Sequence, residues 1–347
     1  MRLLLEIGRY IEIHRCDSGT ACRALTISEK TFRAMPSHIS VVIPTKNAGP
    51  EFEHLLELLC HQEVKSNVEV LVVDSGSKDT TLEICRRYPV RVESIASDQF
   101  GHGRTRNLGI SLTSGEIICL LTQDALPTDS RFLANLVQPF SNQDVAGVVG
   151  RQIAKPDASP LTVRDVGRWI LGSLQSRVSR ITSQNQFEEL PPIEQYLLCA
   201  FDNVCSAIRR SVWERIPFPD VLFGEDIEWG YRVLRCGYAV AYQPDAAVYH
   251  SHDRPIRYQY QRMTVDHYRL CELFGLETVP SVWHIPGAVV RQTVGDLRDL
   301  LRMGGSVSAR FRDALRVPVR SLAQVAGQYR GARAYRRGRA PEEREAV

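Results

Sequence analysis

Apolar runs and turn residues alternate regularly along the chain from residue 37 to residue 153. The run ISVVIP at 39–44 is rich in β-branched residues and has no polar face, which predicts a strand buried on both faces. Apolar residues within 51–62 recur at helical spacing instead. The same reasoning predicts further strands at 68–74, 90–95, 115–125 and 145–153, and helices at 77–87 (with Ser77 as N-cap), 104–112 and 129–140. Strands that alternate with helices of this length are typical of βαβ units and a parallel sheet.

The pattern becomes less regular after residue 155. Residues 156–195 contain several Pro and Gly residues and predict a long excursion with one or two helices. Beyond it we expect a strand at 205–210, a helix at 225–235 and a bent strand or strand pair that ends at His250. The fold class is therefore α/β, a mostly parallel sheet flanked by helices. It divides into 37–155 and 156–253, with an extension of unassigned role at 1–36 and a helical extension at 254–347.

Composition excludes several classes of protein. The chain has 44% hydrophobic and 24% charged residues, which is ordinary for a globular protein and unlike collagen, a coiled coil or a disordered chain. Its nine cysteines are odd in number and form no CxxC pair, which argues against a disulfide framework or a structural zinc site and favours reduced thiols in the cytoplasm. No run of about 18 apolar residues occurs, and the N-terminal apolar run is too short and too charged for a signal peptide.

The net charge of +3 hides an uneven distribution. Residues 300–340 hold ten arginines and one aspartate, a charge of +9, so the rest of the chain carries −6. Apolar residues, among them Phe311, Leu315 and Leu322, are interleaved with these arginines, and Pro318 interrupts the pattern. Such a stretch is typical of contact with an anionic membrane surface, although nucleic acid or plain solvation are alternatives. Upstream, apolar residues at helical spacing over 260–274 predict a helix packed back on the body.

Polar residues gather at the predicted strand ends. In an open parallel sheet, ligands bind beyond the carboxyl ends of the strands. The residues there are Pro44, Thr45, Asn47, Asp74, Arg104, Arg106, Gln123 and Asp124. Carboxylates suit ribose or a pyrimidine, arginines suit phosphates, and one carboxylate suits a bridging Mg²⁺, so the set predicts a nucleoside diphosphate site. No GxGxxG follows the first strand and no P-loop occurs. Asp74 or Asp124 as turn residues, and Arg106 paired with a rim carboxylate, stay open as alternatives.

Two further clusters lie in the second half. Glu225, Asp226 and Glu228 open the predicted helix at 225–235, where acids favour the helix dipole and caps are one interpretation. Trp229 and Tyr231 follow them, so a second interpretation is a general base in an aromatic-walled pocket. His250 and His252 close the last strand, as metal ligands or as a polar turn.

Taken in order, these motifs resemble the family 2 glycosyltransferases of GT-A fold over about residues 38–253. The resemblance rests on ISVVIPTKN, Asp74-Ser-Gly-Ser, Arg106-Asn107-Leu-Gly, Gln123-Asp124 and Glu225-Asp226. The segment FGHGRTRNLG followed by LLTQDA resembles the branch of bacterial rhamnosyltransferases. The resemblance implies inverting, metal-dependent transfer of a sugar, with dTDP-rhamnose favoured among dTDP- and UDP-sugars. The acceptor would be lipid-linked or a polysaccharide in cell-surface synthesis, and the protein would be cytoplasmic or peripheral at the inner membrane face.

The resemblance also implies roles for individual residues. Pro44, Thr45 and Asp74 would contact the nucleoside, Arg106 the nucleotide, and Asp226 of the Glu225-Asp226 motif would be the catalytic base. Asp124 matches the last position of the DxD metal motif, and Thr122 at the first position is a departure. Mg²⁺ or Mn²⁺ would then bind through Asp124 and a histidine, with His250 and His252 as competing candidates. Residues 37–155 would bind the donor and 156–253 the acceptor. Nucleotidyl transfer is an alternative chemistry, and we expect no nucleic acid partner.

Overall fold

The computed structural model describes residues 36–341, so the expected extension at 1–36, with Cys16 and Cys22, lies almost entirely outside it. The strands are β1 (His38–Thr45), β2 (Asn67–Asp74), β3 (Arg91–Ser94), β4 (Ile117–Leu121), β5 (Leu126–Pro127), β6 (Val145–Ile153), β7 (Arg177–Arg180), β8 (Cys205–Arg209) and β9 (Ala239–Tyr249). The α-helices are α2 (Glu51–Cys60), α3 (Thr81–Cys85), α4 (His102–Ser111), α5 (Phe132–Val137), α6 (Pro160–Arg168), α7 (Gln184–Glu189), α8 (Pro192–Leu198), α9 (Arg210–Trp213), α10 (Glu225–Arg235), α11 (Ile256–Phe274), α12 (Ile285–Arg302) and α13 (Val307–Arg336). Short 3₁₀ turns are η1 (Ser97–Gln99), η2 (Gln138–Ser141), η3 (Ile170–Gly172) and η4 (Val282–His284).

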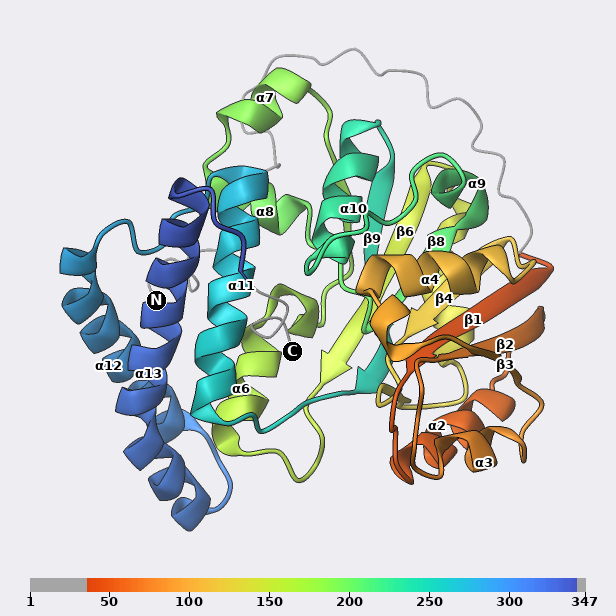
Figure 1. The fold of residues 1–347 in the computed structure, drawn as a ribbon, viewed down its shortest axis with the longest axis horizontal. Coiled ribbons are helices and arrows are strands. Elements are labelled where there is room, and N and C mark those ends of the chain that lie inside the picture. Colours follow the sequence, from red (N-terminus) through yellow and green to blue (C-terminus); the bar gives the residue numbers. More distant parts are fainter. Residues whose placement is uncertain (1–35, 342–347) are drawn as a thin grey trace, which may run out of the picture.

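One sheet runs through the body of the molecule (Figure 1) in the order β3-β2-β1-β4-β8-β6-β9-β5, with β7 paired to β9. β3, β2, β1 and β4 are parallel, as the alternating pattern predicts. β8 is antiparallel to both β4 and β6, and β5 and β7 are antiparallel to β9. The sheet is therefore mixed. Its first half, β3-β2-β1-β4, is the predicted parallel sheet, and in its second half β6 and β9 are parallel to each other while β8, β5 and β7 run antiparallel to their neighbours.

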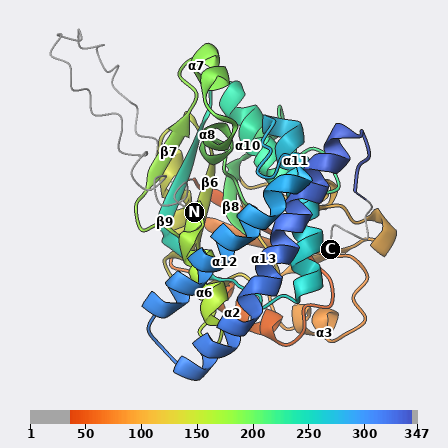
Figure 2. The same ribbon diagram turned by 90° about the vertical axis from the view of Figure 1, so that its left-hand side faces the viewer.

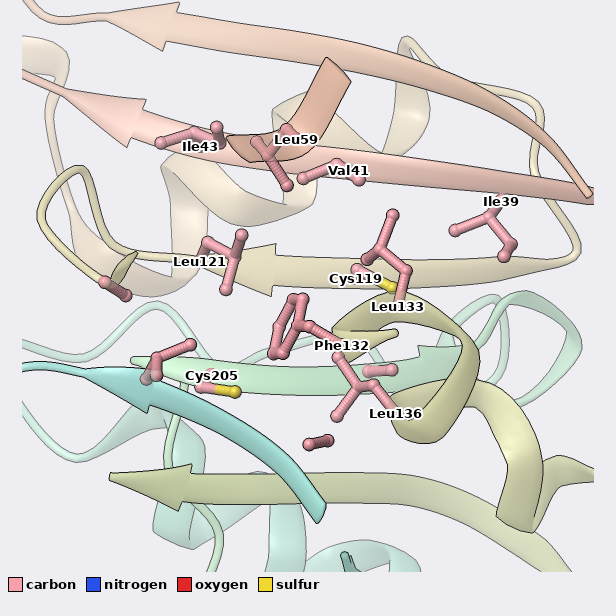
Figure 3. Close-up of a cluster of buried hydrophobic side chains, with 14 of the residues drawn as sticks. Ile39, Val41, Ile43, Leu59, Cys119, Leu121, Phe132, Leu133, Leu136 and Cys205 are labelled. Carbon is pink, nitrogen blue, oxygen red and sulfur yellow. The ribbon is translucent and has the colours of Figure 1, made fainter. Parts of the chain in front are cut away.

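The first strands are buried on both faces, as their sequence predicts. In β1, Ile39, Val41 and Ile43 point into one apolar cluster and Val42 into the other. Figure 3 shows the first cluster, where these side chains meet Phe132, Leu133 and Leu136 of α5. The second cluster lies under α4 and α10 and centres on Trp229. Two cores on opposite faces hold the strand ends in fixed register.

Most predicted elements occur at or near their expected positions. The helix at 225–235 has the predicted bounds, and the bent-strand interpretation is confirmed by β9, whose pairing with β6 shifts register between Gly150 and Arg151. The helix expected at 77–87 is shorter: α3 begins after Thr80. Ser77 is not its N-cap, because its hydroxyl accepts the Asn47 N–H at 2.8 Å instead.

The C-terminal extension is helical and packs on the body. In Figures 1 and 2, α11, α12 and α13 lie together, away from β1–β3. Phe274 of α11 contacts the rings of Tyr196 and Tyr231, which confirms the helix packed back on the body. α13 continues through Pro318, contrary to the expected interruption, because Pro318 faces solvent while Val317 is buried and anchors the helix. Within residues 36–341, no helix is both long and apolar enough to cross a membrane.

α11 and α13 approach each other closely at two glycines. A Cβ on Gly327 would lie 2.5 Å from the Tyr260 carbonyl oxygen, and one on Gly331 would lie 2.3 Å from that of Thr264. Only glycine permits such backbone contact. α11 is thereby fixed between α13 and the body.

Candidate active site

The loops that follow β1, β2 and β4 are tied to one another. The Lys46 N–H donates to Gln123 Oε1 at 2.8 Å, and Gln123 Nε2 donates back to the Lys46 carbonyl at 3.2 Å. Asn47, with φ 47°, accepts the Lys78 N–H on its side-chain oxygen at 2.8 Å. Asn47 and Gln123 therefore hold these loops together through hydrogen bonds to the backbone. The predicted convergence of strand ends is confirmed for these loops.

Asp74 ends β2, beside these loops. It is 1% exposed, and its Oδ2 accepts the N–H groups of Gly76 and Ser77 at 3.0 Å each. Its Oδ1 is buried and has no hydrogen-bond partner within the described residues. Asp74 is thus a turn residue, as one interpretation held, and it also offers a free acceptor. A buried acceptor without a partner is costly unless a ligand supplies a donor.

The remaining predicted nucleoside contacts adjoin Asp74. Pro44 and Thr45 end β1 and pair in register with Val73 and Asp74 of β2. Thr45 is buried and its hydroxyl donates to the Ile43 carbonyl at 3.1 Å. Its hydroxyl is therefore already engaged within the protein.

A second cluster joins Asp124 to both candidate histidines. β5 pairs with β9 so that Leu126 lies opposite Tyr249, which brings the loop after β4 to the end of β9. His252 Nε2 lies 2.9 Å from Asp124 Oδ2, and His250 Nε2 lies 3.6 Å from Asp124 Oδ1. One oxygen and two nitrogens lie within 4.8 Å of one another, a group able to hold a metal ion. The sequence left the two histidines as competitors, and the structure places both at the site.

A hydrogen bond to Gln152 fixes which ring nitrogen of His250 carries the proton. Gln152 Nε2 donates to Asp202 Oδ2 at 3.0 Å, so its Oε1 faces His250 Nδ1, also at 3.0 Å. An amide oxygen only accepts, so Nδ1 carries the proton and the Nε2 lone pair faces the cluster. This arrangement is common for metal-binding histidines. Burial opposes ionisation of Asp124, but the hydrogen bond from His252 and the two neighbouring imidazoles outweigh it, so the pKa of Asp124 lies below its ordinary value.

Asp226 lies in the first turn of α10. Its Oδ1 accepts the Ile227 N–H at 2.8 Å, and the Asn203 N–H points to Oδ2 at 3.4 Å. Burial, followed by the charges of Glu225 and Asp202, raises the pKa of Asp226 well above its ordinary value. A carboxyl group with a raised pKa suits proton abstraction near neutral pH.

Glu225 and Arg106 form a buried ion pair beside Asp226. Arg106 Nη1 lies 2.8 Å from Glu225 Oε1, and each side chain is 5% exposed. Asn203 Nδ2 also donates to Glu225 at 3.2 Å, and Arg106 donates to the His102 carbonyl at 3.1 Å. Burial opposes ionisation of Glu225, but Arg106, His102 and Asn203 together lower its pKa. The pair joins α4 to α10 and orients the turn that carries Asp226.

Comparison with known proteins decides the family. A search against protein-family models matches residues 40–216 to the family described as Glycosyl transferase family 2. The chain belongs to glycosyltransferase family 2. It is 35% identical over 228 residues to the O-antigen chain rhamnosyltransferase RfbN of Salmonella typhimurium (65% of this chain, 69% of that protein). It is 30% identical over 235 residues to the O-antigen chain rhamnosyltransferase WbaN of Salmonella anatum (66% and 70%).

Among solved structures, the fold resembles the mannosyltransferase PcManGT of Pyrobaculum calidifontis, solved in complex with GDP-Man and Mn²⁺. The TM-score is 0.59 at 20% identity, covering 96% of this chain and 93% of that one. The fold of this family 2 glycosyltransferase is GT-A, as the resemblance implied. It is an enzyme, and nucleotidyl transfer gives way to glycosyl transfer.

The structure also corrects some expected roles in this glycosyltransferase. Trp229 and Tyr231 do not wall a pocket at Asp226: Trp229 is fully buried against Phe201 and Phe218, and Tyr231 packs on Phe187. α10 has no side-chain cap, so its acids are not caps in that sense. Arg106 is enclosed by its pair with Glu225, so contact with a nucleotide through its guanidinium would require that pair to open. Arg104 is exposed, 3.6 Å from Asp220.

Residues near the site that the sequence did not indicate are Gln152, Asp202, Asn203 and Arg262. Asp202 and Asn203 precede β8, whose Cys205 pairs with Leu121 at the end of β4. The start of an antiparallel strand lies at the same edge as the ends of its parallel neighbours, so the direction of β8 was the missing information. Arg262 comes from α11 and lies 3.9 Å above the Phe223 ring. Arg262 lies in a helix beyond the motifs of the site, so no local signal in the sequence linked it to them.

Proposed function

We propose that this enzyme transfers L-rhamnose from dTDP-rhamnose, with inversion, to an acceptor hydroxyl in cell-surface polysaccharide or glycolipid synthesis. The observation that carries the proposal is the chain of contacts from Asp124 through His250 and Gln152 to Asp202, whose charge in turn acts on Asp226. This chain supports a leaving-group site and a base at one edge of the sheet. The two relatives named as rhamnosyltransferases support the choice of sugar.

The nucleoside would occupy the crevice at Asp74. A ribose hydroxyl or the pyrimidine N–H of thymine would supply the donor that Asp74 Oδ1 lacks. Pro44 and Thr45 would lie against the nucleoside, and the loops held by Asn47 and Gln123 would set the width of the crevice. Arg104, exposed at the N-terminal turn of α4, is available to a phosphate.

The proposed metal site is Asp124 with His250 and His252. A divalent cation bound there would neutralise the charge that develops on the diphosphate leaving group. Two imidazole nitrogens favour Mn²⁺ over Mg²⁺, because Mg²⁺ prefers nearly all-oxygen ligands. PcManGT, of the same fold, was solved with Mn²⁺ and a nucleotide sugar, which supports this assignment.

Asp226 is the proposed base. It would take the proton from the acceptor hydroxyl as that oxygen attacks the anomeric carbon from the face opposite the diphosphate. The anomeric carbon–oxygen bond to the diphosphate breaks with its electron pair, and the product carries the opposite anomeric configuration. Glu225 and Arg106 would position Asp226 without touching the substrates. The acceptor would approach from the side of Arg262 and Phe223.

The test separates donor binding from transfer. Calorimetry with Mn²⁺ should show that dTDP-rhamnose binds the wild type and Asp226→Asn with equal affinity, whereas product formation in the variant falls by at least 10³-fold. Asp74→Ala should instead weaken donor binding, with Glu83→Ala, an exposed carboxylate on the neighbouring helix α3, as the control. Turnover by Asp226→Asn near the wild-type rate, or no binding of any nucleoside diphosphate sugar, would contradict the proposal.

A further inference from the structure

The helical hairpin formed by α12 and α13 with the turn at 303–306 presents apolar side chains to solvent. They are Val290, Val294 and Leu301 on α12, and Phe311, Leu315, Val319 and Leu322 on α13. Within each helix these positions fall on one face, since they recur three, four or seven residues apart. Leu301 is 81% exposed, and Trp283, just before α12, is 88% exposed. Exposed apolar faces of this extent mark an interaction surface.

On the hairpin, acidic side chains point inward and arginines occupy exposed positions. Residues 285–336 contain ten arginines, three aspartates and no lysine or glutamate. The aspartates point inward: Asp313 accepts the Leu161 N–H at 3.0 Å, and Asp296 and Asp299 pair with Arg164 of α6. Exposed positions hold arginines instead, namely Arg291, Arg298, Arg302, Arg312 and Arg316. The outer face therefore combines apolar and cationic groups, with no carboxylate among its described residues.

We propose that this hairpin lies on an anionic lipid bilayer, with the apolar stripe at the headgroup–acyl boundary and the arginines among the lipid phosphates. Apolar and cationic residues on one helix face are the features that bind helices in the plane of a membrane. Trp283 and Phe311 add aromatic rings, which favour that interface.

A second copy of the chain fits this face less well. A two-fold interface would bring the same arginines of both copies together, and no carboxylate on the face would compensate them. Figure 2 shows α12 and α13 side by side, facing outward. A broad, acid-free surface of this kind matches the uniform negative potential of an anionic bilayer.

The position of the hairpin gives the binding a consequence for catalysis. α11 lies between α13 and the site: its Tyr260 and Thr264 meet Gly327 and Gly331, while its Arg262 lies over Phe223 beside the Asp226 turn. A bound hairpin would place two helix layers, α13 and α11, of about 10 Å each between the lipid surface and the site. An acceptor carried on a lipid would be presented there. This last step rests on the proposed function, whereas the membrane binding itself does not.

The experiment uses full-length protein and vesicles of phosphatidylcholine alone or with about 30% phosphatidylglycerol. Sedimentation should show binding to the anionic vesicles that weakens at least tenfold between about 0.1 and 0.5 M salt. Phe311→Ser with Leu315→Ser, and separately Arg298→Glu with Arg302→Glu, should each reduce binding at least tenfold. Leu174→Ser with Val178→Ser is the matched control, because these side chains are also exposed but lie outside the hairpin. Thermal melting confirms that each variant is folded.

Trp283 supplies a local signal. Its fluorescence should be open to acrylamide quenching in the free protein and should become protected and shift to the blue on anionic vesicles, with the change absent in Trp283→Phe. Protection without vesicles would mean that a second copy or another segment covers the face and would overturn the proposal. Equal binding to neutral vesicles, or a gel shift with DNA tighter than the vesicle binding, would also overturn it. Calorimetry of dTDP-rhamnose on the same samples reports the proposed function separately.

Discussion

Asp226, the proposed base, carries an electrostatic cost when it ionises. Its pKa is raised by burial and by the charges of Glu225 and Asp202. A raised pKa means that the folded protein resists the ionisation that the unfolded chain undergoes near pH 4. The wild type therefore loses stability as pH rises from about 4 to the folded pKa of Asp226, and the loss stays constant above it.

We accordingly expect Asp226→Asn to melt at a higher temperature than the wild type at pH 7.5, with the difference shrinking toward pH 4, where both side chains are neutral. The rate of transfer by the wild type should rise with pH through the raised pKa, because only the carboxylate accepts a proton. Melting curves and initial rates across this range measure both. If Asp226→Asn melts below the wild type at neutral pH, ionised Asp226 does not destabilise the folded protein.

The histidines make a second prediction at the residue scale. His250→Ala and His252→Ala should each weaken Mn²⁺-dependent binding of dTDP by roughly ten- to a hundredfold, because each removes one nitrogen from the cluster with Asp124. His61→Ala, an exposed histidine on another loop, is the control. Calorimetry measures the affinity, and the electron paramagnetic resonance spectrum of bound Mn²⁺ reports the ligands. A loss confined to one histidine would reduce the site to two protein ligands.

The sequence predicted those site residues whose position follows from local order along the chain, and missed those whose role depends on contacts with distant strands. Asp74 and Asp124 were found because they follow buried parallel strands, and that position alone places them. Gln152 and Asp202 were missed because their role depends on strand direction and on contacts made across β8 and β9. Trp229 was misplaced because an aromatic residue one turn after an acid can point either to the site or to the core.

At the scale of elements, the buried pair Arg106–Glu225 is the joint between α4 and α10. Removing one partner leaves a buried charge without compensation, so Arg106→Met or Glu225→Gln should cost about 3–5 kcal/mol of unfolding free energy. The double variant should recover much of that loss. Arg87→Ala breaks a comparable but exposed pair with Glu53 and should cost less than about 1 kcal/mol. Urea unfolding measures all four variants.

The same variants decide between two roles for Arg106. If it only orients α10, the stable double variant binds dTDP as the wild type does and loses transfer rate. If Arg106 instead holds the nucleotide, as the family resemblance implies, the double variant loses dTDP affinity while remaining folded. The sequence could not separate these roles, because the partner of Arg106 lies more than a hundred residues away.

The helices of the extension could be predicted from local sequence, but the continuity of α13 could not. Apolar spacing predicted α11 and a helical extension over 254–347, but it also led us to expect that Pro318 interrupts the arginine-rich part. What makes α13 one continuous helix through Pro318 is packing: glycine contacts with α11 on one side and buried Val317 beside Leu161 and Leu300 on the other. The cost of one proline, about 3 kcal/mol, is small against burial along the whole helix.

For the whole molecule, the question is whether this extension is part of the catalytic body. Charged contacts join α6, α12 and α13: Arg164 of α6 pairs with Asp296 at 2.8 Å, and Arg320 of α13 pairs with Asp165. Asp313 of α13, 4% exposed, accepts the Leu161 N–H in the first turn of α6. α6 follows directly from β6 of the central sheet, so the extension and the sheet share buried contacts and should unfold together.

We therefore expect Asp313→Ala to destabilise the entire protein rather than the hairpin alone. The substitution leaves a buried N–H without an acceptor and should cost about 1–3 kcal/mol. Far-UV circular dichroism, dominated by the long helices, and the near-UV signal, which includes buried Trp229 of the body, should give coincident urea transitions that shift together. Arg312→Ala, its exposed neighbour, should leave both unchanged. Two separate transitions, with only the helical one moved by Asp313→Ala, would mean that a membrane-bound hairpin could detach from the catalytic body, and the proposed spacing between lipid surface and site would then fail.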